Sequence, residues 1–130
     1  MLKADTKSLL LQKNVLNKKY RLKKKSAFTA TYKIKNSFYK NGVVLFVGKK
    51  KCDDTPTKVG FVVSKKTHKS AVKRNRLKRL MRESYRLLLK NDSLGNSNKA
   101  MSLIFIGQKE ALGKPFNEIQ RSISNLLMRV

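Results

Sequence analysis

The residues with the clearest chemistry lie close together in the middle of the chain, between positions 74 and 82. They carry guanidinium, ammonium or amide groups: Arg74, Asn75, Arg76, Lys78, Arg79 and Arg82. A planar guanidinium can donate two parallel hydrogen bonds to a phosphate, whereas an ammonium acts as a point charge. Because arginine predominates here and lysine predominates elsewhere in the chain, the segment favours a shaped nucleic-acid surface over diffuse attraction to lipid.

A helix must position these groups. Residues 70–90 contain no Gly or Pro, and at about 100° per residue they divide into two faces. The apolar face gathers Leu77, Leu80, Met81, Ser84, Leu87 and Leu88. The opposite face gathers Asn75, Lys78, Arg79, Arg82 and Arg86, with Arg74 at the flank between the two. Glu83, the one acidic residue, is expected to pair at the edge of the cationic face, with Arg79 or Arg76, and to leave most of that face unneutralised.

Aromatic residues supply a second candidate site. Phe28 and Tyr32 lie four positions apart and share one face of a predicted short helix, for which Ser26 is the expected N-cap. Phe46 lies on a predicted strand whose alternate side chains, Val44 and Phe46, face the same way. If these rings line a groove, they can stack unpaired bases. The periodicity is equally consistent with ordinary core residues, so both interpretations stay open.

The charge of the whole chain points to a polyanionic partner. The 130 residues include 32 Lys and Arg against 7 Asp and Glu, a formal net charge of +25. A net charge of magnitude about 2–8 already keeps a small domain soluble, and uncompensated positive charge destabilises a compact fold through self-repulsion. Nucleic acid is the first candidate partner, because neutralised phosphates release condensed counterions. An anionic membrane is the second.

Length and composition fit a single intracellular domain. The 40% hydrophobic content is compatible with a modest core. No apolar run approaches the ~18 residues of a membrane span, and the N-terminus lacks the apolar block of a signal peptide, so we expect a cytoplasmic protein. Cys52 is the only cysteine, which excludes an intramolecular disulfide and a thiolate metal cluster. We expect one RNA-binding domain over residues 19–130, preceded at residues 1–18 by a basic, mobile extension.

The remaining segments predict an α+β fold. Strands are predicted from β-branched and apolar composition at residues 35–39, 42–48, 58–64 and 101–107. Residues 49–57 have the composition of a loop, and a final helix over residues 114–129 is expected to start at Pro115. Helices and strands in this order are typical of a sheet packed by helices.

One segment of the chain resembles a known family. Residues 64–84, SKKTHKSAVKRNRLKRLMRES, are similar to the signature of the protein subunit of bacterial ribonuclease P. The likeness extends upstream to RLKKKSAF at residues 21–28 and to Tyr32, and it covers roughly residues 19–129. It implies the order α-β-β-β-α-β-α, a four-stranded sheet packed by helices, and a left-handed β-α-β crossover, a topology also found in the second domain of a ribosomal protein. It also implies that the protein joins a catalytic RNA, which removes the 5′ leader of precursor tRNA by endonucleolytic cleavage.

The resemblance implies a role for each candidate residue. Arg74, Asn75, Arg76, Lys78, Arg79 and Arg82 would contact the catalytic RNA, and a cleft for the single-stranded leader would comprise Lys24, Phe28, Tyr32 and Phe46. Two features depart from the family pattern. Tyr32 stands where many members have a second phenylalanine, and the turn at residues 67–70 is one residue longer. His68 in that turn is expected to be a solvated loop residue.

The protein is expected to be an accessory subunit of the enzyme, with the catalytic centre in the RNA. A protein nuclease needs a general base or a cluster of carboxylates that holds Mg²⁺, whereas the acidic residues here are scattered and there is one histidine. The Mg²⁺ would be bound by the RNA, and the protein is expected to bind no cofactor or metal itself.

Two other classes of protein share the charge and the size of this chain. One is a structural ribosomal RNA-binding protein, and the other is a DNA-binding regulator whose arginine-rich helix enters a major groove. The signature segment at residues 64–84 argues against the first, and competition between precursor tRNA and duplex DNA at fixed salt would discriminate the second. The expected partners are therefore ribonuclease P RNA and precursor tRNA, with no DNA and no membrane.

Overall fold

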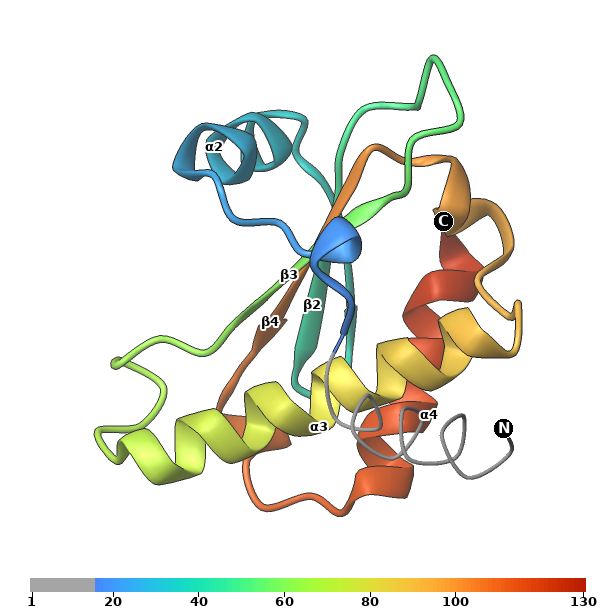
Figure 1. The fold of residues 1–130 in the computed structure, drawn as a ribbon. Helices are drawn as coiled ribbons and strands as arrows, with labels where there is room; N and C mark the ends of the chain where they lie inside the picture. The colour runs from blue at the N-terminus through green and yellow to red at the C-terminus, as the bar shows by residue number, and fades with distance from the viewer. Residues whose placement is uncertain (1–15) are drawn as a thin grey trace, which may run out of the picture.

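A four-stranded sheet and three α-helices form the part of the chain that the structure, a computed structural model, describes, which is residues 16–130 (Figure 1). The helices are α2 (Lys25–Lys33), α3 (Ala71–Lys90) and α4 (Phe116–Arg129), and the strands are β1 (Asn36–Lys40), β2 (Val43–Val47), β3 (Lys58–Val62) and β4 (Ser102–Gly107). Short 3₁₀ turns are η1 (Lys18–Tyr20), η2 (Gly95–Lys99) and η3 (Lys109–Ala111). The predicted α+β class and the order α-β-β-β-α-β-α are confirmed.

The strands lie side by side in the order β1-β2-β4-β3. β1 and β2 are antiparallel, β2 and β4 are antiparallel, and β3 runs parallel to β4. Parallel neighbours require a crossover connection, and α3 lies in the segment that connects β3 to β4. β3 is consequently an edge strand, with one side of its backbone turned away from the sheet.

The sheet has one face that is buried and one that is partly open. In β2, Val43, Leu45 and Val47 are buried, whereas Val44 and Phe46 are half-buried. This alternation follows from the two-residue period of a strand. It confirms the prediction that Val44 and Phe46 face the same way.

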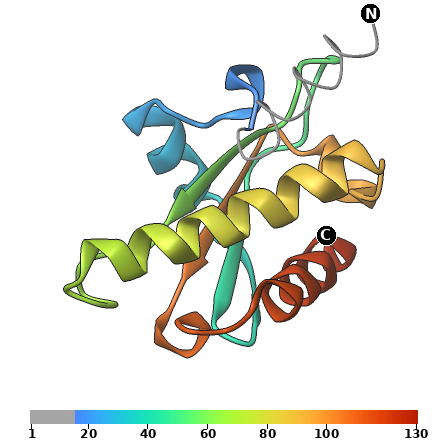
Figure 2. The same ribbon diagram turned by 60° about the horizontal axis from the view of Figure 1, so that its bottom comes forward.

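The helices divide between these two faces. A Cβ built on Gly107 would meet Leu77 of α3, whereas a Cβ built on Gly60 would lie 2.6 Å from the Phe28 ring of α2. Because the two glycines fall on opposite faces of the sheet by the strand register, α3 and α2 pack on opposite faces. Figure 2 shows α3 crossing the strands with α4 beside it, and α2 standing apart. The face under α2 is the one that carries Phe46.

The core between the sheet and α3 contains a cluster of aromatic rings. The rings of Phe61 and Phe105 stack with centroids 5.7 Å apart, and Tyr85 of α3 lies 6.0 Å from Phe105. Tyr85 is 1% exposed, and burial raises the pKa of its phenol. The helical periodicity did not assign Tyr85 to the apolar face, whereas the predicted Leu80 and Leu87 are only half-buried. The buried face of α3 is therefore rotated toward Tyr85 relative to the prediction.

The start of the first helix differs from the sequence-based expectation. Ser26 is not the N-cap of the first helix, because α2 begins at Lys25 with Lys24 in the cap position and no side-chain hydrogen bond there. The chain before α2 already contacts the domain, since Leu22 N–H donates to the Val59 carbonyl over 2.9 Å. Most of the predicted extension, residues 1–15, lies outside the described residues. Leu16, within the predicted extension, is 1% exposed.

The backbone at both ends of β1 determines where the strand starts and stops, and it starts one residue later than predicted. Lys35 has a φ of 59°, which an extended strand residue does not adopt, and the strand begins at Asn36. At the other end Asn41 and Gly42 both have positive φ, 47° and 90°. An Asn-Gly pair of this kind forms the tight turn that suits two antiparallel strands.

None of the helices in residues 16–130 combines the length and the apolar character needed to cross a membrane.

Candidate RNA-binding surfaces

The turn that precedes α3 fixes the first arginine of the cationic face. Ser70 is the N-cap, and its Oγ accepts a hydrogen bond from Lys73 N–H at 3.5 Å. Arg74 Nη1 donates to the carbonyl of His68 over 3.0 Å and to that of Lys69 over 3.3 Å. Part of the Arg74 guanidinium therefore holds the turn in place, in addition to any contact with RNA.

His68 has a structural role in the same turn. It is half-buried, and its Nδ1 accepts a hydrogen bond from Ser70 N–H at 2.9 Å. The expectation of a solvated loop residue is thus wrong. The reason is local: the ring turns back toward the start of α3, where it meets an N–H group that the helix cannot satisfy itself.

The predicted residues of α3 divide into an outer side and a flank. Asn75, Arg76 and Arg79 are exposed, whereas Arg74, Lys78 and Arg82 are half-buried. The second set is spaced by four residues, so it forms one row along the helix. Among the outer residues, Arg76 is also anchored, because its Nη2 donates to the Lys114 carbonyl over 3.3 Å.

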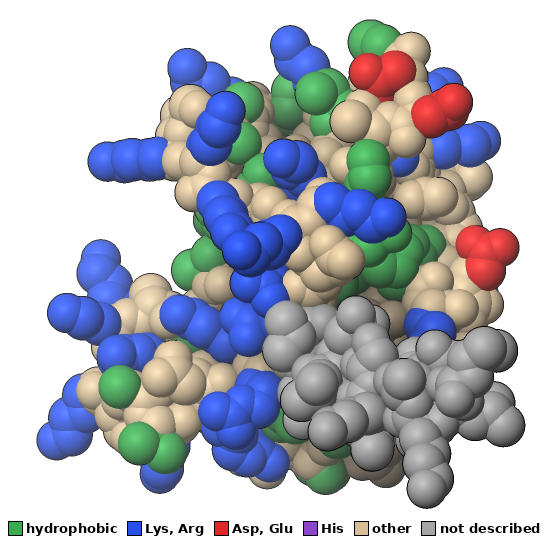
Figure 3. Space-filling view, viewed as in Figure 1, with side chains coloured by type: hydrophobic (Ala, Val, Ile, Leu, Met, Phe, Trp, Pro, Cys, Tyr) green, Lys and Arg blue, Asp and Glu red, His purple; other side chains and the backbone are tan. Residues whose placement is uncertain are grey.

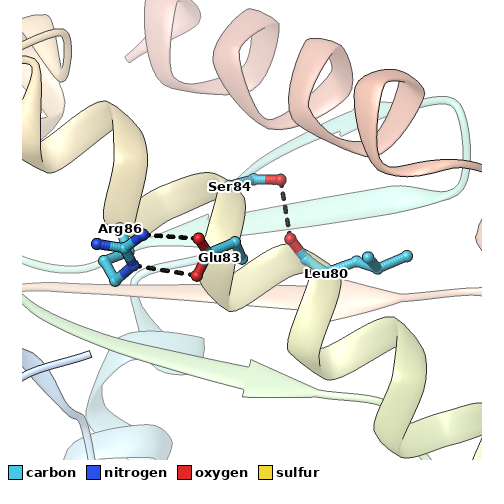
Figure 4. Close-up of polar contacts among 4 residues, drawn as sticks. All are labelled: Leu80, Glu83, Ser84 and Arg86. Atoms are coloured by element: carbon cyan, nitrogen blue, oxygen red, sulfur yellow. Dashed lines mark hydrogen bonds and ion pairs between the residues drawn. The ribbon is translucent and has the colours of Figure 1, made fainter. Parts of the chain in front are cut away.

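Glu83 pairs with Arg86, and the expected pairing with Arg79 or Arg76 is wrong. Arg86 Nη2 lies 2.6 Å from Glu83 Oε1, and Arg86 Nε donates to Oε2 over 3.0 Å (Figure 4). The two-point geometry suits a guanidinium better than a single contact would, and it raises the pKa of Arg86. Within residues 16–130 this is the one ion pair. The first three turns of α3 therefore keep their positive charge.

The same stretch of helix shows how α3 packs. Ser84 Oγ donates to the Leu80 carbonyl over 2.8 Å (Figure 4), and the residue is fully buried. A serine can lie in this apolar face because its hydroxyl is satisfied by its own helix.

Arg82 leaves the outer side of α3 and turns toward the sheet. Its guanidinium carbon lies 5.9 Å from the centre of the Phe61 ring. Burial is the main cause that lowers the pKa of Arg82, followed by the positive charges of Arg21 and Arg79. The prediction that Arg82 lies opposite the apolar face is corrected, because burial of Tyr85 brings the adjacent flank of α3 down to the sheet edge.

The predicted aromatic residues lie together over the open face of the sheet. Tyr32 and Phe46 form an edge-to-face pair with centroids 5.0 Å apart, and Phe28 lies over Gly60. Between Gly60 and Phe46 in the strand register is Ile104, which is fully buried. The rings are half-buried, and burial raises the pKa of the Tyr32 phenol. They cover the sheet and still present apolar surface to a ligand. Lys24 is exposed at the start of α2.

Positive charge surrounds these two surfaces. Figure 3 shows Lys and Arg side chains gathered on the face formed by α2 and α3, while the acidic side chains of this view lie at its opposite margin. The arrangement combines cations with half-buried rings, which is the chemistry that binds the backbone and the bases of single-stranded nucleic acid.

Comparison with known proteins places the chain in a family. The family model described as Ribonuclease P matches residues 16–130. The chain belongs to the Ribonuclease P protein family. A curated member, the ribonuclease P protein component of Clostridium kluyveri, is 40% identical over 110 residues, which are 85% of this chain and 93% of the relative.

Solved structures of Ribonuclease P family proteins have the same fold. The protein from Staphylococcus aureus superposes with a TM-score of 0.69 at 28% identity, over 85% of this chain and 94% of the other. The protein from Thermotoga maritima gives a TM-score of 0.69 at 25% identity, over 85% and 96% of the two chains.

The sequence-based site assignment omitted several residues that the structure of this Ribonuclease P family member brings to the same place. Arg21, Lys23 and Phe61 line one cavity with Phe28 and Arg82. Arg21 and Lys23 belong to the resembling segment RLKKKSAF, so a signal was present. The sequence contains no such signal for Phe61, because its position in a predicted strand indicates only burial.

Proposed function

We propose that this chain acts as the protein component of ribonuclease P, which binds a catalytic RNA and the 5′ leader of precursor tRNA and promotes removal of the leader. The observation that carries the proposal is the juxtaposition of a cationic helix with a half-buried aromatic surface. Membership of the family supports the same assignment.

The outer side of α3 is the surface proposed to bind the catalytic RNA. Asn75, Arg76 and Arg79 are exposed there, and no acidic group of residues 16–130 forms an ion pair with them. Each phosphate that such a residue neutralises releases condensed counterions, which makes binding favourable and salt-dependent. Guanidinium groups add geometric selectivity for phosphate oxygens.

The aromatic surface under α2 is proposed to bind the leader. Phe28, Tyr32 and Phe46 are half-buried rings beside an open sheet face, and Lys24 is exposed at the near end of α2. Base stacking on such rings tolerates any sequence, because every base has a π-face. A leader is single-stranded, so its bases are free to stack.

We assign the chemistry to the RNA and its Mg²⁺ ions. In residues 16–130, no three His, Cys, Asp or Glu side chains lie close enough to hold a metal ion together. The protein's contribution is then to hold substrate and RNA in register, and to reduce the need for Mg²⁺ by supplying positive charge of its own.

Reconstitution tests this division of labour. Purified chain and a bacterial ribonuclease P RNA should together cleave precursor tRNA to the mature 5′ end at a Mg²⁺ concentration at which the RNA alone is slow. Cleavage by rigorously RNA-free protein would contradict the assignment of the chemistry. Equal rates with and without the chain, at every Mg²⁺ concentration, would contradict the proposed function.

A further inference from the structure

A cavity of about 290 Å³ opens at the free edge of β3, between the segment before α2 and the flank of α3. Its lining includes Arg21, Lys23 and Arg82 together with Phe28, Gly60 and Phe61. The hydrogen bond from Leu22 N–H to Val59 covers the start of the β3 edge. A cavity of this size lies at the lower end of the range for small ligand sites, so it suits one small group.

The polar groups of this cavity are cations. Arg82 is half-buried, and burial together with Arg21 and Arg79 makes its charged form less favourable. No Asp or Glu lines the cavity, and the one ion pair of residues 16–130 is that of Glu83 with Arg86. A partly buried cation that lacks a partner destabilises the fold, so an anion bound here would relieve repulsion that the free protein carries.

The two arginines are held in position before any ligand binds. Arg21 Nε donates to the Leu16 carbonyl over 2.6 Å, which fixes one edge of that guanidinium. The Arg82 guanidinium rests over the Phe61 ring at 5.9 Å, and a cation over an aromatic face is attracted to it. Two preset guanidinium groups from separate segments match the several oxygens of one phosphate.

Phe28 connects the cavity to the aromatic surface. It lines the cavity, and it is one of the rings proposed above to stack leader bases. An RNA strand that stacks a base on Phe28 therefore has its backbone within reach of the cavity. Because Arg82 has turned away from the outer side of α3, we expect this flank of the helix to contact the leader and not the catalytic RNA.

We propose that Arg21 and Arg82 bind one backbone phosphate of the single-stranded leader. The proposal rests on the proposed function and extends it, because it moves Arg82 from the catalytic-RNA set to the substrate set and adds Arg21. A phosphate contact carries no sequence information but fixes register. The pair would hold the leader at one position along the protein whatever its sequence.

The test uses precursor tRNAs in which single leader linkages are replaced by uncharged methylphosphonates. With wild-type holoenzyme, one linkage should show a loss of affinity of about ten-fold, the effect of one charge-assisted hydrogen bond. With Arg82→Gln or Arg21→Gln, neutralising that same linkage should cause no further loss. Arg82→Lys, which keeps the charge but not the planar fork, should retain part of the effect.

Arg79→Gln is the matched control, because it removes an equal charge from the exposed side of the same helix. It should weaken assembly with the catalytic RNA and leave the ten-fold linkage effect intact. Melting temperatures of the free variants establish that each is folded, and Arg82→Gln should melt no lower than wild type.

Four results would overturn the phosphate assignment. The linkage effect could persist undiminished in Arg82→Gln and Arg21→Gln, or these variants could lose affinity for the catalytic RNA alone. Wild-type holoenzyme could instead prefer precursor over mature tRNA with no sensitive linkage, in which case the proposed function stands without this pocket. Equal affinity of wild-type holoenzyme for both RNAs would overturn both proposals.

Discussion

Phe46 is the residue at which base stacking and core packing can be separated. It is half-buried, and its ring meets Tyr32 at an interplanar angle of 85°. Phe46→Leu keeps an apolar side chain over the sheet but removes the π-face. Since stacking contributes about 1–3 kcal/mol per base, holoenzyme with this substitution should bind leader-bearing precursor tRNA roughly ten-fold more weakly.

Mature tRNA serves as the internal control for Phe46→Leu, because it has no leader to stack. Its affinity should stay nearly unchanged, and the melting temperature of the free protein should fall by only a few degrees. Equal losses for both RNAs would show that Phe46 acts through the packing of the domain. Titration of both RNAs at one salt concentration, next to thermal melts, gives the comparison.

Tyr85 makes stability depend on alkaline pH. Its phenol is buried in the core and has a raised pKa, whereas an unfolded tyrosine ionises near pH ~10. A pKa that is higher in the folded state contributes stability that is complete below the unfolded value and is lost as the pH rises above it. Between pH ~9 and ~11 the wild type should therefore lose stability relative to Tyr85→Phe.

Urea unfolding at several pH values measures this difference. Tyr85→Phe keeps the ring and lacks the titrating hydroxyl, so it cancels the effects of lysine deprotonation that both proteins share. If the difference in the free energy of unfolding between the two proteins stays constant across this pH range, the burial of an un-ionised phenol is contradicted.

At the scale of the element, α3 has separate surfaces for separate tasks. One side is buried between the sheet and α4 and includes Leu77, Met81 and Leu88, and the outer side carries exposed cations. The flank between them carries the row that ends at Arg82, above Phe61. Substitutions on these surfaces should consequently have different effects, even though the residues are close in sequence.

The outer side is tested by Arg76→Gln combined with Arg79→Gln. The pair should weaken assembly with the catalytic RNA and reduce the slope of log K against log salt by about 0.7–0.9 for each lost phosphate contact. Lys50→Gln with Lys99→Gln removes the same charge from exposed positions away from α3. If both double substitutions change the slope equally, RNA binding depends on the net charge of the molecule and not on the position of the cations on α3.

The sequence predicted α3 well and the direction of its side chains less well. The absence of Gly and Pro and the apolar period place the helix correctly. A helical projection contains no information on how far the core extends around the helix. Tyr85 is buried whereas Leu80 and Leu87 are half-buried, so the buried face is rotated toward the side of α3 that carries Arg82, and Arg82 lies over Phe61.

The other differences have equally local causes. The projection permits Glu83 to meet cations on either side, and the two-point contact with Arg86 decides between them. The start of α2 was misplaced because the cap there uses no side chain at all. The structure gathers the three predicted aromatic residues over one face of the sheet. The grouping of Arg21, Lys23 and Phe61 around the cavity depends on tertiary contacts, which a sequence pattern does not contain.

At the scale of the whole molecule, charge dominates the behaviour of the free protein. A net charge of +25 accompanies one ion pair within residues 16–130, so the folded state brings like charges together with little compensation. Raising the KCl concentration from about 20 mM to about 0.5 M shortens the screening length to a few ångströms. The free energy of unfolding should therefore rise by about 1–2 kcal/mol.

Urea titrations at several KCl concentrations measure this effect, because urea is uncharged and does not itself screen. The slope of the free energy against urea should stay constant, since the surface exposed on unfolding is unchanged. A free energy of unfolding that stays constant or falls as the KCl concentration rises would show that the cations are too far apart to repel one another.

Gly60 sets how closely α2 approaches the sheet. Any side chain there would collide with the Phe28 ring, since a Cβ would come within 2.6 Å of it, and the ring would have to move away from β3. Phe46 is attached to a different strand and would stay where it is. The distance between the two rings that we propose to stack leader bases therefore depends on the absence of a side chain at position 60. Even an alanine at this position would push the Phe28 ring away from the sheet and change its distance from Phe46.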